Sequence, residues 1–452
     1  MLNIKELNVK CPEVEYVLNA ASKYALGDDN AFISFYNAQD GQPVDTSPII
    51  EDFGDVAPFL WVCGDPDIAR KEFKAVFDAL GQDVLHINPR RSRQWMIHTY
   101  DWTDLLLGLM DYYEISRDEN ALALLSQIFD VWQDAFCHDH TVSGQAIKLQ
   151  GRLYALPVSR MLDVGMFPEL LLKYAAFVDE DQAADLKERA AFIVRQWAAT
   201  DFSQKTGLFP DTAISQNPMR GAIETLVSAV TGKLDTHHSC TLFKHNTNAL
   251  ASVLSVWVQT KDPEFLELMA KWLRGCRTHL LNADNRVNMS WHATKGVTKG
   301  ATDHNFQVVD LMCDIAYETK DDQYIDFAVS VADAWIKMLS PIGLMPHHES
   351  GKRSHQAMSD SQTDFSVALL KLAALTGNKE YAIVAEKIMA AVKKYMYLPC
   401  GMATWVNVHD GTPLDNVCKT KFMILSLKGW LALHNQEKIY QDEEFTKILS
   451  DR

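Results

Sequence analysis

Polar residues capable of acid/base chemistry recur where the apolar helices predicted from the sequence begin. The candidate acids and bases at these positions are Tyr100, Asp101, His245, Asp303, His304 and Asp360. Aspartate and asparagine are also preferred N-cap residues, so any single one of these aspartates could simply cap its helix. Capping does not require the neighbouring histidines and aromatic residues, however, and several of these on converging loops indicate a pocket.

Loops with aromatic, basic and histidine side chains flank these candidates and suit a sugar ligand. Sugar rings stack their C–H faces on aromatic rings, and arginine side chains bind carboxylates in a bidentate manner. The candidate substrate-binding residues are Arg90, Arg91, Arg93, Trp95, His98, Trp102, Arg152, Asn246, Trp291, His292, His347, His348 and Trp405. The basic cluster at residues 90–93 has two interpretations, an ordinary solvated loop or an anion site that would bind an acidic sugar.

A metal ion is an alternative ligand for the histidine-rich segments, but their spacing does not favour it. The candidates are His138-Asp139-His140, His237-His238 and His347-His348-Glu349, and none has the i,i+4 spacing of a helical zinc site. No glycine-rich strand-to-helix turn of the nucleotide-binding type occurs in the sequence. We therefore expect no cofactor, with a divalent metal as the alternative.

The unit that must position these residues is a helical hairpin, and it recurs along the chain. In residues 301–335 the first half is apolar on most sides, whereas the second half has one apolar and one polar face. Such hairpins turn at Gly64-Asp65-Pro66, Ser116-Arg117-Asp118, Val178-Asp179-Glu180, Thr260-Lys261-Asp262-Pro263, Thr319-Lys320-Asp321, Thr376-Gly377-Asn378 and Asn435-Gln436-Glu437. The repeat predicts an all-α toroid, an (α/α)6 or (α/α)7 barrel of inner and outer helices with short hairpin-like loops.

The length of the chain is consistent with a ring. Its 452 residues exceed the usual size of one compact core, yet no linker or low-complexity run divides them. A ring grows by adding hairpins, so we expect one domain over residues 51–440, an irregular lead-in over residues 1–50 and a tail over residues 441–452. Near copies at residues 207–210 and 343–346 follow two outer helices, which places equivalent loops at one end of the ring.

Charge and hydropathy exclude several partners. The formal net charge of −16 argues against a nucleic-acid partner, whose phosphates require a basic face. No apolar run approaches the roughly 18 residues of a membrane span, and the N-terminal sequence lacks a basic-then-apolar signal pattern. We therefore expect a cytoplasmic protein with no membrane partner. The eight cysteines form no CxxC pair, which favours buried free thiols over disulfides or a thiolate metal site.

The hairpins, the aspartates at inner-helix starts and the histidine-bearing loops together resemble the (α/α) barrel carbohydrate-active enzymes. These comprise unsaturated glucuronyl hydrolases, toroidal polysaccharide lyases and the N-acylglucosamine 2-epimerase group. For the hydrolases, the resemblance implies an acid and a base drawn from Asp101, Asp163, Asp303 and Asp360. For the lyases, it implies Tyr100, His98, His245 or His304 acting with Arg90, Arg93 or Arg152.

We expect an enzyme that cleaves a glycosidic bond in a uronic-acid-containing oligo- or polysaccharide, by hydrolysis or by β-elimination. Two alternatives stay open, a sugar epimerase of the N-acylglucosamine 2-epimerase or uronyl C5-epimerase type, and a non-catalytic helical-repeat binding protein. An enzyme should have a closed funnel lined by polar residues, whereas a scaffold should have a long groove or a flat apolar patch. The second and fifth hairpins are three steps apart, so their inner ends should face each other across the substrate.

Overall fold

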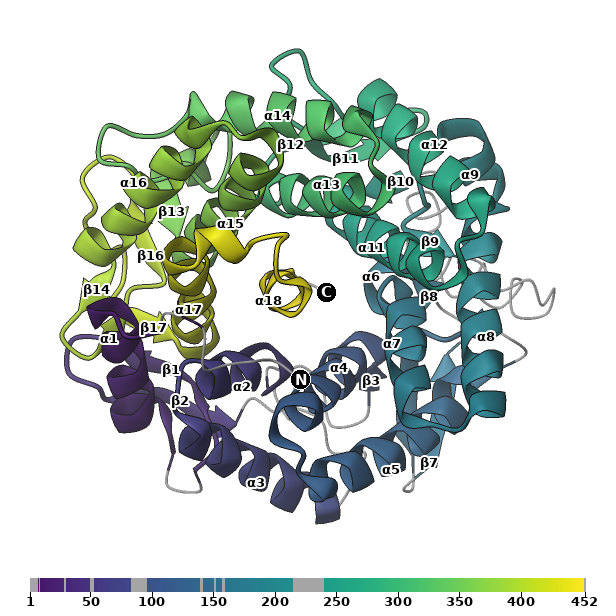
Figure 1. Ribbon diagram of the computed structural model, residues 1–452, viewed down its shortest axis with the longest axis horizontal. Coiled ribbons are helices and arrows are strands. Elements are labelled where there is room, and N and C mark those ends of the chain that lie inside the picture. The colour runs from purple at the N-terminus through teal and green to yellow at the C-terminus, as the bar shows by residue number, and fades with distance from the viewer. Residues whose placement is uncertain are drawn as a thin grey trace.

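The protein is a double ring of helices, with an inner ring inside an outer one (Figure 1). The computed structural model describes residues 7, 9–27, 30–48, 53–82, 96–138, 141–149, 152–156, 159–213 and 240–450. Within this part of the chain the inner helices are α2 (Phe53–Val62), α4 (Thr99–Ser116), α7 (Phe167–Tyr174), α11 (Phe243–Thr260), α13 (Asn305–Thr319), α15 (Ser359–Thr376) and α17 (Thr420–His434). The outer helices are α1 (Pro12–Ala20), α3 (Pro66–Gln82), α5 (Glu119–Phe136), α8 (Glu180–Ala198), α12 (Pro263–His279), α14 (Asp322–Ile336) and α16 (Lys379–Tyr395). The prediction of an all-α toroid is confirmed, with the hairpins arranged as in an (α/α)7 barrel.

The ring closes between the two ends of the chain. α17 packs against α2, and α1 packs against α17 from outside. The expected irregular lead-in is wrong for residues 12–20, because α1 buries Val14, Val17 and Ala20 on one face and supplies the seventh outer helix. The segment from Pro12 to Ala20 is therefore part of the ring.

Inner and outer helices differ in burial as the hairpin pattern predicts. α13 is buried on most sides from Phe306 to Ala316, whereas α14 buries mainly the face that carries Phe327 and Trp335. Trp335 packs edge-on against Phe306, with ring centroids 5.2 Å apart. Large buried rings of this kind hold the two layers together, each contributing about 2–3 kcal/mol by burial.

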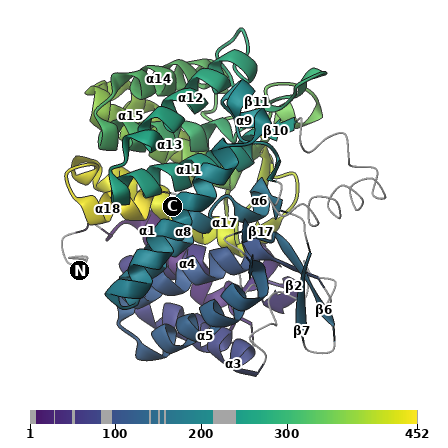
Figure 2. The same ribbon diagram turned by 90° about the vertical axis from the view of Figure 1, so that its right-hand side faces the viewer.

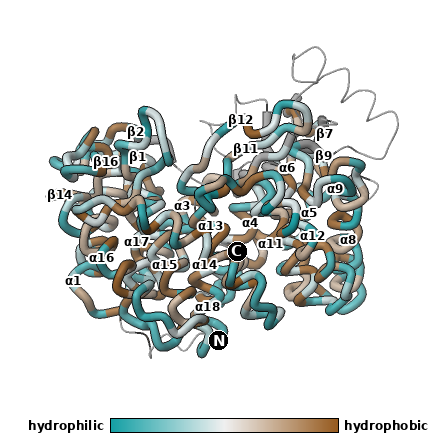
Figure 3. Tube along the Cα trace, turned by 90° about the horizontal axis from the view of Figure 1, so that it is seen from above, coloured by the Kyte–Doolittle hydropathy of each residue, from teal (hydrophilic) through white to brown (hydrophobic). Residues whose placement is uncertain are grey.

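Short strands lie at one end of the ring, where outer helices return to the next inner helix (Figure 3). They are β1 (Ile33–Asn37), β2 (Pro43–Pro48), β3 (Met96–His98), β4 (Cys137–His138), β5 (Thr141–Val142), β6 (Gln145–Leu149), β7 (Arg152–Leu156), β8 (Ser159–Arg160), β9 (Thr212–Ala213), β10 (Cys240–Leu242), β11 (Asn288–His292), β12 (Gly296–Ala301), β13 (Gln356–Met358), β14 (Tyr397–Leu398), β15 (Gly401–Met402), β16 (Trp405–Asn407) and β17 (Val417–Lys419). The three-stranded sheets have the orders β17-β1-β2, β10-β11-β12 and β3-β6-β7. Because β3, β10, β13 and β17 run directly into inner helices, the polar residues at the helix starts lie at this end.

A side-chain amide ties each of three inner helices to the loop that follows an outer helix. Each amide oxygen accepts from a loop N–H, and each amide nitrogen donates to the carbonyl of the same loop residue. The pairs are Asn246 with Phe209 (2.9 and 2.9 Å), Asn305 with Val287 (2.7 and 2.9 Å) and Gln362 with Met345 (2.8 and 3.0 Å). All three amides are fully buried, so each one satisfies backbone groups that water cannot reach. We call Asn246, Asn305 and Gln362 the anchor amides.

The opposite end of the ring carries the tight turns and the C-terminal helix. Capping side chains in these turns begin the next helix, since Asp118, Asp179, Asp262, Asp321 and Asn378 each accept a hydrogen bond from one of its backbone N–H groups. The expected tail contains α18 (Glu443–Leu449), which lies within the ring (Figure 1), on the side away from the strands (Figure 2). Its next residue, Ser450, donates to Asp314 Oδ2 at 3.0 Å, and Lys371 Nζ lies 3.1 Å from the same carboxylate.

The remaining helical segments are short connections within this frame. They are η2 (Ala21–Ala25), α6 (Met161–Val164), η3 (Ala175–Phe177), α9 (Asp201–Thr206), η4 (Lys352–His355) and η5 (Gln436–Lys438). A search of the described helices for one long and apolar enough to cross a membrane finds none.

Candidate functional site

The inner helices enclose a cavity of about 1010 Å³ along the axis of the ring. At the strand end, Tyr100, Asp303, His304 and Asp360 line this cavity, which brings four of the predicted catalytic residues to one space. At the other end, Ile448 of α18 lines it. The helices that supply Tyr100 and Asp303, α4 and α13, lie on opposite sides of the ring (Figure 1). A ligand in this cavity would therefore lie between them.

Among the acids that line the cavity at the strand end, Asp303 is held by two neighbouring side chains and through its own backbone N–H. Its Oδ2 accepts hydrogen bonds from Ser361 Oγ and from His347 Nδ1. Its backbone N–H donates to the carbonyl of His347 at 3.0 Å. The residue is only 4% exposed, and its Oδ1 has no hydrogen-bond partner among the described residues. One carboxylate oxygen is thus fixed, and the other is buried without a partner among the described residues.

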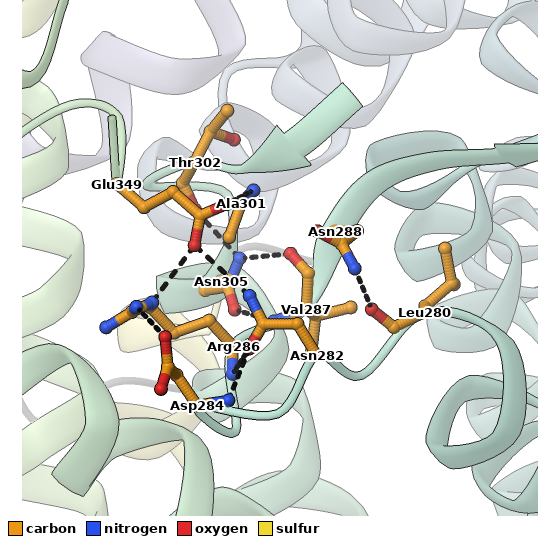
Figure 4. A network of polar contacts seen from close by, with 10 residues as sticks. All are labelled: Leu280, Asn282, Asp284, Arg286, Val287, Asn288, Ala301, Thr302, Asn305 and Glu349. Atoms are coloured by element: carbon orange, nitrogen blue, oxygen red, sulfur yellow. Dashed lines mark hydrogen bonds and ion pairs between the residues drawn. The ribbon is translucent and has the colours of Figure 1, made fainter. Parts of the chain in front are cut away.

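A polar network fixes the backbone on both sides of Asp303 (Figure 4). Glu349 Oε1 accepts from the N–H of Ala301 at 2.9 Å, while its Oε2 accepts from Arg286 Nε at 3.1 Å. Asn305 Nδ2 donates to the carbonyl of Thr302 at 2.8 Å. In the sequence, the signal for this network is the His-His-Glu segment at residues 347–349, whose residue types make it a metal candidate. Glu349 instead supports the segment that carries Asp303.

The protonation of His304 and Tyr100 follows from their surroundings. Burial lowers the pKa of His304 to about 4, although the nearby charge of Asp303 opposes this, so its imidazole is neutral at neutral pH. The charge of Asp104, followed by burial, raises the pKa of Tyr100 well above its ordinary value, so its phenol stays protonated. The cavity therefore offers a neutral imidazole on one wall and a phenol on the other.

Further charged residues of the cavity were not among the candidates predicted from the sequence. They include the acids Asp55, Asp104 and Asp364 and the bases Lys244, Lys419 and Lys421. Helical spacing could have found two of them, since Asp104 and Asp364 lie four residues after Tyr100 and Asp360 and so share their helix faces. Lys421 forms an ion pair with Asp55, whereas Lys244 forms no ion pair within the described residues.

The structure contradicts the expected sugar-binding role of Trp102 and Asn246. Both side chains are fully buried. The ring of Trp102 packs against Phe136 at 6.2 Å between centroids, so it leaves no face on which a sugar could stack. Asn246 is an anchor amide and also accepts from Trp272 Nε1 at 3.1 Å. Both residues stabilise the barrel.

Three other predicted residues lie away from the cavity lining. His245 Nδ1 lies 2.8 Å from Asp211 Oδ1. Trp291 packs on His279 with centroids 4.4 Å apart, and His292 is only 5% exposed and bonded to Thr294. Because His245, Trp291 and His292 are not in the cavity lining, the structure does not favour a role for them in its chemistry.

His347, His348 and Trp405 gather beside Asp303. The ring of His347 lies edge-on to Trp405 at 5.0 Å and to His348 at 4.5 Å between centroids. Burial lowers the pKa of His348, and the neighbouring His347 lowers it further. None of the three belongs to the cavity lining, and only His347 bonds to Asp303, so their role as ligand contacts stays a prediction.

The remaining predicted residues lie wholly or partly outside the described structure. Arg90, Arg91, Arg93 and Trp95 belong to residues 83–95, which the structure does not describe. For His98, Asp101, Arg152 and Asp163 only the backbone is described, at the end of β3, in the first turn of α4, at the start of β7 and in α6. Of the histidine-rich segments, residues 139–140 and 237–238 are also outside it. These residues stay predictions.

Comparison with known proteins gives structural matches only. No protein-family model matches the chain, and no curated protein matches it in sequence. An alpha-1,2-mannosidase from Trichoderma reesei matches with a TM-score of 0.67 at 12% identity, over 94% of this chain and 92% of that one. The unsaturated glucuronyl hydrolase of Bacillus sp. GL1 matches with a TM-score of 0.52 at 12% identity, over 94% and 96% of the two chains. A cellobiose 2-epimerase from Bacillus thermoamylovorans B4167 matches with a TM-score of 0.54 at 11% identity, over 94% and 97%. The resemblance to (α/α) barrel carbohydrate-active enzymes is thereby confirmed at the level of the fold.

Proposed function

We propose that this chain is a carbohydrate-active enzyme that cleaves a glycosidic bond in an acidic saccharide, with Asp303 as its central carboxylate. The geometry of Asp303 carries the proposal. His347 and Ser361 hold one oxygen of this buried carboxylate, while its other oxygen has no partner among the described residues. A catalytic carboxylate must be held in one orientation and yet keep one oxygen for the substrate. Asp303 meets the first condition at the wall of a cavity large enough for a sugar. Its unpaired Oδ1, which is shielded from solvent in the structure, is the oxygen that we assign to the substrate.

The carboxyl groups of the cavity suit hydrolysis. In hydrolysis one carboxylic acid protonates the leaving oxygen, while a carboxylate activates water or attacks the sugar. We assign the carboxylate role to Asp303, because its Oδ2 accepts from two donors. Asp360 begins the adjacent inner helix and Asp104 lies on the opposite one, and both line the cavity. These two residues are the candidate acids.

Lysines at the cavity wall support an acidic substrate. The chain as a whole has a formal net charge of −16, yet Lys244, Lys419 and Lys421 line the cavity. Lys244 forms no ion pair in the described structure, so its ammonium group is available to a sugar carboxylate. The unsaturated glucuronyl hydrolase that shares the fold is described as responsible for the degradation of glycosaminoglycan, an acidic polysaccharide. The undescribed arginines at residues 90–93 would add to this preference.

His304 favours a second candidate function, sugar epimerisation. A neutral imidazole can take a proton from a carbon next to a carbonyl group, which is the first step of epimerisation and also of β-elimination. His304 is neutral at neutral pH and lines the same cavity. A cellobiose 2-epimerase is among the proteins that share the fold.

A substrate panel tests the proposal and separates the reactions. The full chain is incubated with saturated and unsaturated uronate oligosaccharides and with neutral oligosaccharides, while reducing ends, ultraviolet absorbance and sugar configuration by NMR are followed. We expect new reducing ends from an acidic saccharide. A gain of absorbance would indicate elimination, and a change of configuration without cleavage would favour the epimerase. No change in any saccharide would contradict the proposal.

The anionic preference has its own test with a matched control. Lys244→Gln should raise KM for the acidic saccharide several-fold, most strongly at low salt, where the charge is least screened. Lys261→Gln removes the same charge from an exposed turn at the other end of the ring and should leave KM unchanged. Equal behaviour of the two variants would contradict an anion-binding role for Lys244.

A further inference from the structure

Three metal-ligating side chains from opposite ends of the chain meet where α1 packs on α17. Cys11 is the N-cap residue of α1, Glu13 lies in its first turn, and His434 ends α17. One ligand atom of each residue lies within 4.8 Å of the other two. In the described part of the chain, no other set of three such side chains meets this spacing. None of the three lines the cavity that contains Asp303.

The surroundings of the cluster point to a missing ligand. His434 Nε2 is shielded from solvent and has no hydrogen-bond partner among the described residues. A buried imidazole nitrogen without a partner is costly, and native proteins rarely leave one so. The His434 ring stacks on Trp430 at 6.4 Å between centroids, and the Cys11 residue is 9% exposed. Cys11 is thus buried, whereas Glu13 and His434 are partly exposed, which leaves the cluster open to an ion from solvent.

We infer that Cys11, Glu13 and His434 form a binding site for a divalent transition metal, with zinc as the best fit. A thiolate, an imidazole and a carboxylate are all zinc ligands, at distances of about 2.0 to 2.3 Å, and a water molecule would complete four-coordination. Ligands around such an ion lie roughly 3 to 4 Å apart, so the side chains need to close by about 1 Å. Binding converts the thiol into a thiolate and releases its proton to solvent.

One cation already faces the cluster and limits how the metal can bind. Lys393 Nζ lies 2.5 Å from Glu13 Oε1. Glu13 can keep this contact while it offers Oε2 to the ion, because a carboxylate can bind a metal through one oxygen. The thiolate would balance part of the charge of the ion beside Lys393.

The position of the cluster indicates what the metal would do. α1 is one of the seven outer helices and packs against α17, while its Glu13 forms an ion pair with Lys393 of α16. An ion shared by Cys11, Glu13 and His434 would bind the two helices together and would bind only the folded state. Such binding makes stability depend on the concentration of free metal. The site is therefore a structural clip at the closure of the ring, separate from the proposed chemistry.

The test is metal binding by the full-length protein after dialysis against a chelator. Titration with Zn²⁺ alone should show one tight equivalent, and the melting temperature should rise by several degrees. Titration with Co²⁺ alone should give a thiolate charge-transfer band and the visible bands of a four-coordinate ion. Cys11→Ser, Glu13→Gln and His434→Gln should each weaken binding at least tenfold and reduce the thermal shift.

Two matched variants serve as controls. Glu15→Gln changes an exposed acid on the same helix, and Cys400→Ser changes another buried thiol, so both should bind as the parent does. If His434→Gln fails to fold, the other two variants and the Co²⁺ spectrum still show whether the metal binds at this cluster. Absence of saturable Zn²⁺ binding would overturn the proposal. The proposal would also be overturned if the protein bound metal without a thiolate band and all three variants bound it equally well. That result would place the ion elsewhere, for example at His355 and His409, whose rings lie in contact.

Discussion

Two histidine–aspartate pairs occupy comparable places in the ring, but only one of them contributes to the cavity wall. In the first, His245 on α11 meets Asp211 in the loop that precedes the same helix. In the second, Asp303 at the start of α13 meets His347, which lies in the loop that precedes α15. Asp211 and His347 are equivalent, since each lies two residues after the loop residue that an anchor amide holds. The same two residue types thus do not by themselves mark a site.

The register of the helix start explains the difference. The residues two positions before the three anchor amides are Lys244, Asp303 and Asp360, and all three line the cavity. The residues one position before them are His245, His304 and Ser361, of which His304 and Ser361 line it. In the His245–Asp211 pair the aspartate lies in the loop and does not line the cavity. In the His347–Asp303 pair the aspartate is at the position that lines it. Counting from the anchor amide therefore identifies the position that lines the cavity.

The largest expected effect comes from exchanging each aspartate for asparagine. Asp303→Asn should lower kcat by about 10²- to 10⁴-fold, the usual contribution of a general acid or base. Asp211→Asn should change kcat by about twofold or less, because Asp211 is not in the cavity lining. Initial rates on the substrate found with the panel measure both, and thermal melts confirm folding. Equal losses in the two variants would show that the register does not select the reactive aspartate.

The anchor amides should give a large effect on stability that is the same in both regions. Asn305→Leu leaves the N–H and the carbonyl of Val287 without their partners, at a cost of about 2–4 kcal/mol in the free energy of unfolding. Asn246→Leu should cost a similar amount, since it holds Phe209 in the same way. Denaturant unfolding measures both values. A cost below about 1 kcal/mol in either variant would mean that the loop finds other partners.

Local signals made the hairpins predictable from sequence, whereas the site depends on contacts between distant segments. The turn before Asp321 was predictable because a capping side chain acts on the helix that follows it. The roles of Asn246 and Lys244 could not be predicted from the sequence, because these roles depend on which loop packs against the start of α11. Trp102 was misassigned because an aromatic residue near a helix start has the same local pattern whether it faces the cavity or the outer ring. α1 was missed because its partner, α17, lies at the other end of the chain.

His304 should make the stability of the protein sensitive to acid. Its folded pKa of about 4 lies below the ordinary value of 6.5, so the folded state favours the neutral ring. The contribution of the neutral His304 ring to the free energy of unfolding is therefore complete above pH 6.5, and it is lost as the pH falls from 6.5 towards 4. The loss is on the order of 2 kcal/mol after allowance for solvent screening. His304→Gln, which cannot titrate, should lose less stability than the parent between pH 7 and pH 4.5. Parallel melting curves for both proteins over this range would contradict the assignment.

The smallest effect should come from His245→Gln, although histidine is the residue type most often used in acid/base catalysis. The ring of His245 is bound to Asp211 at 2.8 Å, and a glutamine can keep a hydrogen bond to that carboxylate. We expect kcat and KM to change by about twofold or less and the free energy of unfolding to fall by about 1 kcal/mol or less. Steady-state kinetics and denaturant unfolding check these values. Lys244, the residue before His245, lines the cavity instead, and our proposal gives it a charge role while it assigns the chemistry to Asp303 beside α13. A loss of activity in His245→Gln as large as that in Asp303→Asn would reverse this assignment and move the reacting groups to the α11 side of the ring.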